Sequence, residues 1–472
     1  MLENLLDRAV QLLWGRGTIA FTLLCGLYFT VFTHFLPLRK IGLVTQKTLG
    51  SLFCKKESKD SVSPFAAVST ALGGTMGVGN IIGVGAALAL GGAGSIFWMW
   101  VGALLGMMTK YMEVFLAVRW RVRRPGSRSF CGGPMYYCAR AIPHPIGKLL
   151  AVLFCIFCIL SSLSSGSMVQ TNAIAQSMQQ SFSVSPSLCA VVLVLVCGWV
   201  LHGGCDRAVQ TCSTLVPWMS ALYLFGCGVI LFHFRQNIPS AFSQILTQAF
   251  SSGGIAGAAG FFTCVRVGIS RGIFTHEAGL GSASIAHACS GADSPVEQGF
   301  WGIFEVFCDT ILVCTITALS ILASGVPLGA SGAYQAFCSV MGKTGGRLLG
   351  ISLSLFAFAS VISFCLYGQR CVEYLFGDSR HALFLYHCIF LVGCAAGCFA
   401  RLPVVFALAD LLNACLLLPN LIVLLILSPQ VFSATREYCL KGATHLCSSV
   451  HSNPVPSSKS YCAQRQSSQR SC

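Results

Sequence analysis

The sequence predicts an all-α protein that crosses a membrane about eleven times. One N-terminal helix is expected to precede a core of two groups of about five helices, each with one discontinuous helix. Three observations support this fold class. Hydrophobic residues make up 55% of the 472 residues and charged residues only 10%, whereas charged residues make up about 25% of soluble domains. The basic residues lie between long apolar runs, and clusters of glycine interrupt two of those runs.

The composition also excludes several other classes of protein. The net charge of +15 does not indicate nucleic-acid binding, because the basic residues sit in loops and in the C-terminal tail, as membrane topology requires. Most of the 26 cysteines lie inside apolar runs, where a thiol packs as a small hydrophobic group. Cys155 and Cys158 have the spacing of half a metal site, but no second ligand pair accompanies them. We therefore expect no disulfide, no structural or catalytic metal and no organic cofactor.

The first apolar run, Gly17 to Leu36, predicts a retained membrane helix, since it is longer than a typical signal-peptide core and lacks a convincing cleavage site. The loop behind it is basic, with Arg39, Lys40, Lys47, Lys55, Lys56 and Lys59. Basic loops face the cytoplasm, so the N-terminus is expected outside. Residues 1–62 are thus expected to form an N-terminal transmembrane helix and a cytoplasmic basic loop.

The core is expected to open with a broken helix. No Asp, Glu, Lys or Arg occurs from Ser61 to Thr109, which suffices for two passes, Pro64 to Leu90 and Ser95 to Val118. Residues 73–80 contain four glycines, each of which weakens a helix by about 1 kcal/mol relative to alanine. Unwound backbone inside a membrane must be buried in protein or line a cavity, which indicates a polar ligand. The alternative is a face of small residues that packs against a close helix.

The remaining passes follow in order. They are expected at Leu149 to Gln179, Ser185 to Leu201, Ala208 to Phe234, Ser251 to Ala288, Phe300 to Leu322, Leu348 to Leu366, Ala382 to Phe399 and Leu402 to Leu427. Ser251 to Ala288 contains the second glycine-rich interruption. Because each group has an odd number of helices, the second group enters from the opposite side, as in an inverted repeat with a substrate site between the broken helices.

These passes divide the chain into three parts. The core spans residues 63–428, with repeats at about 63–235 and 250–428. The segment 429–472 is polar and serine-rich, so we expect a disordered cytoplasmic tail.

The second interruption and the pass after it carry ionisable residues. Glu277 is a candidate functional group because a carboxylate inside a membrane is costly, and an ion pair with Arg271 is the structural alternative. His276 is either a proton carrier or a hydrogen-bonded packing residue. Glu305 and Asp309 are about one helical turn apart, and indicate either an ion path or a hydrated helix end.

Other polar groups stand on otherwise apolar helices. Gln170, followed by Thr171 and Asn172, offers donors and acceptors to a zwitterionic ligand, or serves interhelical hydrogen bonding alone. Ser360 and Ser363 supply hydroxyl oxygens where a hard cation would meet carbonyl groups of the first interruption.

Several long motifs resemble those of the alanine or glycine:cation symporter family. They are Ser69-Thr70-Ala71-Leu72, Gly77-Val78-Gly79-Asn80-Ile81, Ala89-Leu90-Gly91-Gly92-Ala93-Gly94 with Phe97-Trp98-Met99-Trp100, Gly132-Gly133-Pro134-Met135-Tyr136-Tyr137, the run from Arg271 to Ser282, and Tyr367-Gly368-Gln369-Arg370. The resemblance covers nearly all of the chain from Trp14 to Leu427. It implies a LeuT-type fold and sodium-driven uptake of a small neutral amino acid, such as alanine or glycine, across the cytoplasmic membrane. No enzymatic activity is expected.

The resemblance also implies which residues form the site. Substrate contacts are expected from Thr75, Val78, Gly79, Asn80, Gln170, Phe274 and His276, and sodium ligands from Gly73, Met76 and Ser360. Arg271 and Glu277 are candidates for a coupling or a structural role. The expected partners are the amino acid, Na⁺ and the lipid bilayer.

Three positions depart from the family pattern. Val78 stands where the family usually has threonine, His276 where it has asparagine, and Ala359-Ser360 where it has two threonines. One hydroxyl group of the expected sodium shell is thus missing, and a proton-coupled carrier or an exchanger is the main alternative. An enzyme using Glu277 and His276 would lack a nucleophile or metal set, and a channel would more naturally use rings of like residues.

Overall fold

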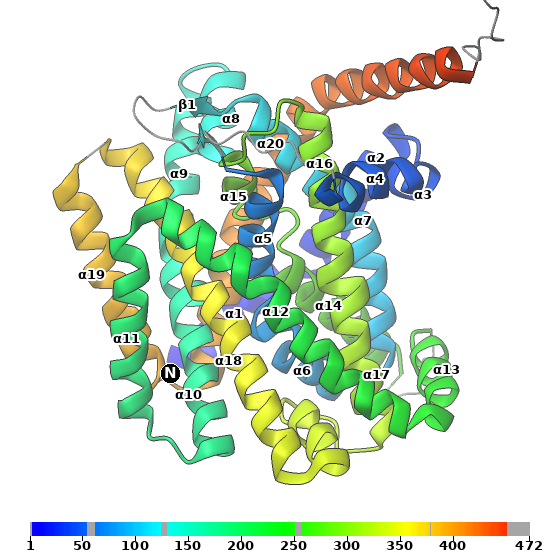
Figure 1. Cartoon of the computed structure of the whole chain (residues 1–472), viewed down its shortest axis with the longest axis vertical. Coiled ribbons are helices and arrows are strands. Elements are labelled where there is room, and N and C mark those ends of the chain that lie inside the picture. Colours follow the sequence, from blue (N-terminus) through cyan, green and yellow to red (C-terminus); the bar gives the residue numbers. More distant parts are fainter. Residues whose placement is uncertain (1, 54–61, 124–129, 251–256, 378, 451–472) are drawn as a thin grey trace, which may run out of the picture.

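The computed structural model describes residues 2–53, 62–123, 130–250, 257–377 and 379–450, and nearly all of these residues are helical (Figure 1). Seven of the described helices are long and apolar enough to cross a membrane. Shorter apolar helices accompany them at Arg16–Phe32, Ile82–Gly91 and Pro186–His202. The prediction of an all-α protein with many membrane passes is confirmed, and the number of about eleven passes stays a prediction.

The N-terminal helices lie against the core. They are α1 (Leu2–Leu13), α2 (Arg16–Phe32), α3 (Leu36–Arg39), α4 (Ile41–Lys47) and η1 (Leu49–Phe53), and α2 matches the predicted first pass. Lys47 donates a hydrogen bond to Glu297 Oε1 at 2.7 Å, and the Tyr438 hydroxyl donates to the same atom at 2.6 Å. The hydrogen bond to Glu297 raises the pKa of Lys47 above its ordinary value. This contact joins α4 to two core helices.

The first predicted interruption is present. It separates α5 (Pro64–Thr75), the short helix η2 (Val78–Asn80) and α6 (Ile82–Gly91). Ser63 caps α5 by accepting a hydrogen bond from Ala66 N at 3.1 Å. Gly77 has an extended backbone, and its N–H donates to Asn80 Oδ1 at 3.0 Å, which holds the break in shape.

The glycines of this segment also permit close helix packing. A Cβ atom built at Gly77 would lie 2.6 Å from Ser360 Oγ, and one at Gly73 would lie 2.9 Å from Ser363 Oγ. Both of the sequence interpretations, a broken helix and a packing face of small residues, therefore describe the same stretch.

The predicted passes that come next are present as helices, and they are accompanied by two short strands and one short helix that were not predicted. The elements of this part of the chain are α7 (Gly94–Arg119), β1 (Val122–Arg123), β2 (Phe130–Cys131), α8 (Pro134–Ala141), α9 (Ile146–Ser161), η3 (Ser162–Met168), α10 (Val169–Phe182), α11 (Pro186–His202) and α12 (Gly204–His233). The strands pair antiparallel as a small hairpin. The stretch η3 is π-helical, and it joins α9 and α10 into the predicted pass from Leu149 to Gln179.

The second predicted interruption lies between α14 (Gly257–His276) and α15 (Ser284–Ala288). The backbone turns left-handed at Glu277 (φ 53°), Gly279 (φ 98°) and Gly281 (φ 79°). Glycine adopts these angles readily, whereas Glu277 is a strained non-glycine residue, a kind of outlier that clusters at functional sites. The helices η4 (Arg235–Asn237) and α13 (Ile238–Gln248), which precede α14, were not predicted.

The remaining elements are α16 (Pro295–Val306), η5 (Phe307–Cys314), α17 (Thr315–Ser324), α18 (Gly332–Phe376), α19 (Arg380–Gly397) and α20 (Leu402–Val450). The stretch η5 is π-helical, and α18 is kinked at Gly342. The expectation of a disordered tail is wrong for residues 429–450, because α20 continues as a helix through Pro429 to Val450. The rest of the predicted tail, 451–472, lies outside the described residues.

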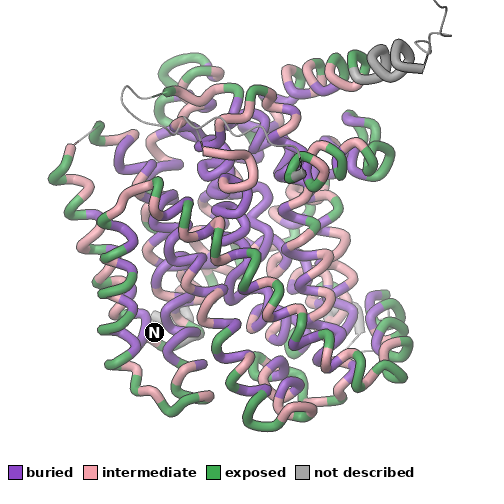
Figure 2. Tube along the Cα trace, viewed as in Figure 1, coloured by how far each residue is buried: buried purple, intermediate pink, exposed green. Residues whose placement is uncertain are grey.

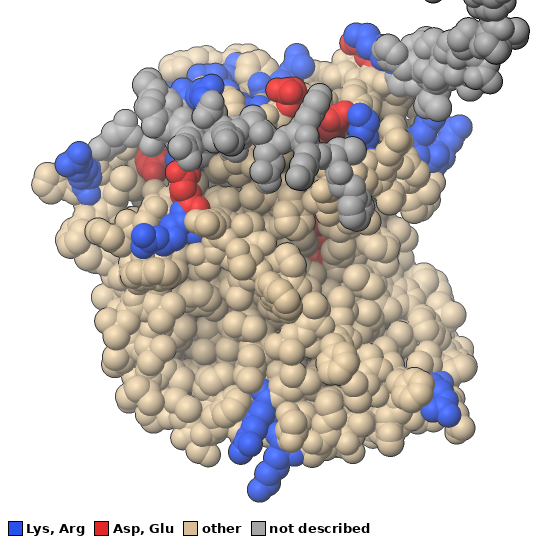
Figure 3. All heavy atoms as spheres, viewed as in Figure 1, with Lys and Arg blue, Asp and Glu red and all other residues tan. Residues whose placement is uncertain are grey.

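The broken helices occupy the interior of the bundle. Residues 67–75 of α5 are all buried, and Figure 2 shows the exposed residues mainly on the outer helices and at the ends. On the face drawn in Figure 3, Lys and Arg gather at the two ends of the molecule, more of them at the end with β1 and α8. Uncharged residues predominate in the broad band between, as expected of a protein that spans a membrane.

Candidate functional site

The two interruptions face each other inside the bundle. A Cβ atom built at Gly79 would lie 2.8 Å from Thr275 Cγ2 and 3.2 Å from Phe274 Cδ1. The last turn of α14 thus packs directly on η2. Val78, Asn80 and Thr275 are at most 1% exposed, so this junction is closed to solvent on both sides.

Gln170 reaches the first interruption from α10. Its Oε1 accepts a hydrogen bond from Val78 N at 3.2 Å, and its Nε2 donates to Ser165 O at 3.1 Å. Ser165 belongs to the π-helical stretch, where the usual helical hydrogen-bond pattern is disturbed and a carbonyl group is available. In this structure Gln170 is therefore hydrogen-bonded to the Val78 N–H group, which belongs to the segment that the resemblance assigns to substrate binding.

Ser360 lies where the sequence predicted a sodium ligand. Its hydroxyl donates to Gly73 O at 2.9 Å, and Ser363, one turn on, donates to Thr70 O at 2.7 Å. All of these oxygens are buried between α5 and α18. Neutral oxygen atoms gathered in this way are the ligands that hard cations prefer. Thr75 and Met76 are also buried in this segment, and the Thr75 hydroxyl turns back to Ala71 O at 3.3 Å.

Asp309 lies between the two interruptions. Its Oδ1 accepts from Asn80 Nδ2 at 2.7 Å and its Oδ2 from Thr310 Oγ1 at 2.8 Å, while Thr310 also contacts Thr275 Oγ1 at 3.1 Å. Asp309 is fully buried, so the interpretation of a hydrated helix end is wrong for it. The carboxylate is surrounded here by amide and hydroxyl groups.

Glu305 is buried as well. It accepts hydrogen bonds from Lys110 Nζ at 3.3 Å and contacts His287 Nε2 at 2.8 Å, and all three side chains have no exposed surface. The hydrated helix end is wrong for Glu305 too, because α7 and α15 cover it. The sequence contained a signal for Lys110, since an ionisable residue inside an apolar pass is a functional or pairing candidate by default.

Glu113 of α7 braces the second interruption. Its Oε1 accepts hydrogen bonds from Gly279 N and Gly281 N, both at 2.9 Å, and from Asn420 Nδ2 at 2.8 Å. A carboxylate is well suited to the backbone N–H groups that an unwound segment leaves without partners. Glu113 was not among the predicted site residues.

Arg271 and Glu277 are not paired with each other. Arg271 Nη2 donates to Asp410 Oδ2 at 2.6 Å, and Glu277 Oε2 accepts from Ser282 Oγ at 2.5 Å. The structural clamp considered from the sequence is therefore wrong. Arg271 fastens α14 to α20, whereas Glu277 stabilises the turn in which it lies.

His276 lies on the α7 side of α14. Its Nδ1 accepts a hydrogen bond from Ala278 N at 3.0 Å, and its Cε1 would lie 3.0 Å from a Cβ atom built at Gly106. Thr275 and Phe274, its neighbours in sequence, face the first interruption instead. A role of His276 in substrate binding stays a prediction.

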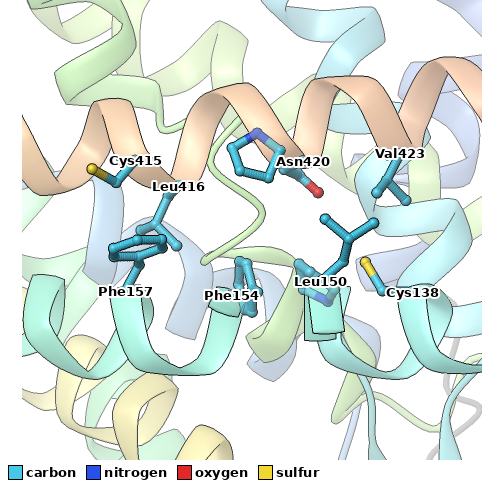
Figure 4. Close-up of a pocket in the computed structure, with 10 residues that line it drawn as sticks. Cys138, Leu150, Phe154, Phe157, Cys415, Leu416, Asn420 and Val423 are labelled. Carbon is cyan, nitrogen blue, oxygen red and sulfur yellow. The ribbon is translucent and has the colours of Figure 1, made fainter. Parts of the chain in front are cut away.

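An apolar cleft lies elsewhere, between α9 and α20 (Figure 4). Its lining residues are Pro134, Cys138, Leu150, Phe154, Phe157, Cys415, Leu416, Pro419, Asn420 and Val423. None of the predicted site residues belongs to this set. An almost wholly apolar lining does not suit a zwitterion, so we do not place the substrate there.

The chain has a fold of the LeuT type, with a buried polar junction between its two broken helices. The chain has a TM-score of 0.59 with MhsT, crystallised in complex with L-phenylalanine, at 14% identity over 78% of this chain and 89% of MhsT. It has a TM-score of 0.52 with a Na⁺-coupled sialic acid symporter, at 13% identity over 84% and 80% of the two chains.

The chain belongs to the sodium:alanine symporter family, whose family model matches residues 1–449. It is 36% identical to the sodium/alanine symporter AgcS of Methanococcus maripaludis, covering 92% of this chain and 97% of AgcS. It is 31% identical to the probable sodium/glutamine symporter GlnT of Bacillus subtilis, covering 93% and 91%. The protein is therefore a transporter and not an enzyme, and the predicted family is confirmed.

Proposed function

We propose that the protein carries a small neutral amino acid, such as alanine or glycine, into the cell together with Na⁺ by alternating access. The observation that carries this proposal is the meeting of Gln170, Phe274 and Ser360 at the first interruption. An amide, an aromatic wall and a hydroxyl–carbonyl pair suit a small zwitterion and a hard cation side by side.

The substrate carboxylate would accept hydrogen bonds from backbone N–H groups at Val78 and Gly79 once the Gln170 amide turns aside. Helix ends with unpaired N–H groups attract carboxylates through the helix dipole. Phe274 and Gly79 limit the space beside the carboxylate, which supports a small side chain on the substrate. Thr75, Asn80 and His276 complete the proposed substrate set.

Sodium would bind between the carbonyl groups of Gly73 and Met76 and the Ser360 hydroxyl. Ser360 donates to Gly73 O at 2.9 Å in this structure, and a small rotation of the hydroxyl would direct both oxygens at one cation. Because substrate and ion share the first interruption, each would stabilise the bound form of the other.

The proposed topology has about eleven passes, an inverted repeat, an external N-terminus and a cytoplasmic C-terminus. The basic residues near β1 and α8 support a cytoplasmic location for that end of the molecule (Figure 3).

Proton coupling is the second candidate, and Asp309 favours it. A fully buried carboxylate whose hydrogen-bond partners here are amide and hydroxyl groups is a natural place to gain and lose a proton. Ala359 offers no hydroxyl group beside that of Ser360, so the proposed sodium site has one oxygen ligand fewer, which also favours proton coupling.

Uptake of labelled alanine and glycine into proteoliposomes distinguishes the candidates. One arm has an inward Na⁺ gradient, and the other has K⁺ on both sides with an imposed pH step. We expect saturable accumulation only with Na⁺. Accumulation driven only by the pH step would transfer the coupling to protons, and no accumulation in either arm would contradict the proposed substrate.

A further inference from the structure

Three cysteines surround a buried arginine at the end of the molecule that carries β1. They are Cys131 of β2, Cys205 in the first turn of α12 and Cys289, which follows α15. Arg370 of α18 lies among them and is 6% exposed. We call these residues the Arg370 thiol cluster. The proposed transport cycle uses none of them.

The guanidinium group contacts sulfur directly. Arg370 Nη1 donates to Cys131 Sγ at 3.3 Å, and Nη2 donates to Cys205 Sγ at 3.0 Å. Glu373 Oε2 accepts from Nη1 at 2.8 Å and so holds the guanidinium in place. A neighbouring arginine stabilises the thiolate form of cysteine, which is the form that reacts with oxidants.

The side chains of Cys205 and Cys289 interact with each other. Cys289 is only 1% exposed, whereas Cys205 is partly accessible. A soluble reagent therefore reaches Cys205 first, and the buried thiol of Cys289 is next to Cys205. This arrangement of an accessible and a resolving cysteine is typical of redox-sensitive pairs.

Cys289 belongs to a segment that connects both broken helices. It follows α15, and two residues later Gly291 N donates to Val62 O at 2.7 Å, just before α5 begins. Arg121 Nη1 holds the same segment by donating to Ser290 O at 2.6 Å. A covalent bond at Cys289 would thus attach this connecting segment to α12.

We propose that Cys205 is an oxidation-sensitive thiol, activated by Arg370, that forms a reversible disulfide with Cys289. The Cys205 thiolate attacks a hydroperoxide, so that a sulfur–oxygen bond forms, the oxygen–oxygen bond breaks and, for hydrogen peroxide, one water leaves after protonation. The Cys289 sulfur then attacks Cys205, the disulfide forms, and the second water leaves with the Cys289 proton. The two thiols lose two electrons and the peroxide gains them.

The cluster lies at the end that we propose to be cytoplasmic. That compartment keeps thiols reduced, so a disulfide there is transient and responsive rather than structural. In the proposed alternating-access cycle the segment after the second interruption moves, and a bond to α12 would stop it. This last step rests on the proposed function, whereas formation of the disulfide does not.

The first test measures thiol reactivity in the purified full-length protein. Each cysteine is alkylated with limiting iodoacetamide from pH 5.5 to 9, and the rates are read by peptide mass spectrometry. Cys439 of α20 is the matched control, since it is also partly accessible. At pH 7 we expect Cys205 to react about tenfold faster than Cys439 and to lose less of its rate at lower pH. Equal pH profiles would overturn the role of Arg370.

The second test maps the disulfide. The protein is treated with hydrogen peroxide, blocked with N-ethylmaleimide and digested without reductant. We expect a Cys205–Cys289 peptide that dithiothreitol removes, that is absent in C205S and C289S, and that is retained in C439S. Absence of this peptide in the unaltered protein would refute the proposal.

A transport assay distinguishes formation of the disulfide from its proposed effect on the transport cycle. We expect peroxide to reduce alanine uptake at least fivefold in the unaltered protein, and dithiothreitol to restore it, with no loss in C289S. A disulfide that forms without loss of uptake would overturn the effect on the cycle and leave the redox site intact. Absence of uptake in the reduced protein would contradict the proposed function instead.

Discussion

Gln170 shows how one side chain shapes the site. Its amide bridges the Ser165 carbonyl and the Val78 N–H group, and it is 3% exposed. The bond to Val78 shields a buried backbone donor in this structure and is replaced by the substrate in the proposed cycle. In this proposal Gln170 contributes both to the stability of the closed junction and to substrate binding. The KM of a Gln170 variant measures the second contribution.

Replacing Gln170 with alanine is expected to raise the KM for alanine uptake. In the proposed bound form the Gln170 amide is hydrogen-bonded to the substrate, and loss of that bond leaves a polar group of the substrate unpaired. Such a loss costs about 1 to 3 kcal/mol, equivalent to about a 5- to 150-fold change. Initial rates in proteoliposomes measure the change. Gln176→Ala is the control, because Gln176 lies on the same helix and bonds only Asn172 among the described contacts. A KM within twofold of the unaltered value would remove Gln170 from the site.

Ser360 is the residue on which sodium coupling depends most. Ser360→Ala is expected to raise the Na⁺ concentration for half-maximal uptake about fivefold or more, since it removes an oxygen ligand. Ser360→Thr keeps the hydroxyl and should stay close to the original value. Ser352→Ala removes one hydroxyl group from the same helix and should have little effect on the Na⁺ concentration for half-maximal uptake. Equal Na⁺ dependence in all of these variants would exclude a sodium site at Ser360.

At the scale of elements, the second interruption is supported from behind by α7. Glu113 accepts from two N–H groups of the unwound segment, and Lys110, one turn earlier, pairs with Glu305 of α16. The π-helical stretch η5 brings Asp309 to the other side of the same junction. α7 and α16 therefore form a polar frame around an interruption that would otherwise leave backbone groups unpaired in the membrane.

Breaking the Lys110–Glu305 pair is expected to destabilise the protein strongly. Lys110→Met leaves a buried carboxylate without its ammonium partner, which costs about 3 to 5 kcal/mol. The measurement is the unfolding midpoint in detergent by intrinsic fluorescence. Lys47→Met breaks the partly exposed pair with Glu297 and should cost less than about 1 kcal/mol. Adding Glu305→Gln to Lys110→Met should recover part of the loss; equal midpoints for Lys110→Met and Lys47→Met would contradict this account.

At the scale of the whole molecule, a largely uncharged band lies between two ends that carry Lys and Arg on the face drawn in Figure 3, as expected of a protein that spans a membrane. The extension of α20 to Val450 continues beyond the predicted last pass at the end where Tyr438 contacts Glu297. The N- and C-terminal segments therefore both pack on the core, and the proposed eleven passes would place the two termini on opposite sides of the membrane.

Topology is tested with cleavable epitope tags at the two termini in intact cells. External protease is expected to remove the N-terminal tag and to leave the C-terminal tag until the membrane is permeabilised. Simultaneous removal of both tags, or protection of both, would mean an even number of passes and would contradict the proposed eleven passes with termini on opposite sides of the membrane. Uptake by the tagged protein serves as the control for folding.

The sequence by itself determined the membrane class, the positions of most of the long apolar helices and the position of both interruptions. These are local properties, since a long apolar run is a membrane pass wherever it lies and clustered glycine weakens a helix without reference to partners. The π-helical stretches, which bring Ser165 and Asp309 to the junction, have no comparable local signal in the sequence.

Only the tertiary structure decided which polar groups meet. Arg271 finds Asp410 rather than Glu277, Glu305 is buried against Lys110, and the thiol cluster gathers around Arg370 from distant parts of the chain. Each of these contacts depends on which helices pack side by side. The free-energy cost of burying a charge in a membrane protein depends on the group with which that charge pairs. Sequence spacing does not specify this partner.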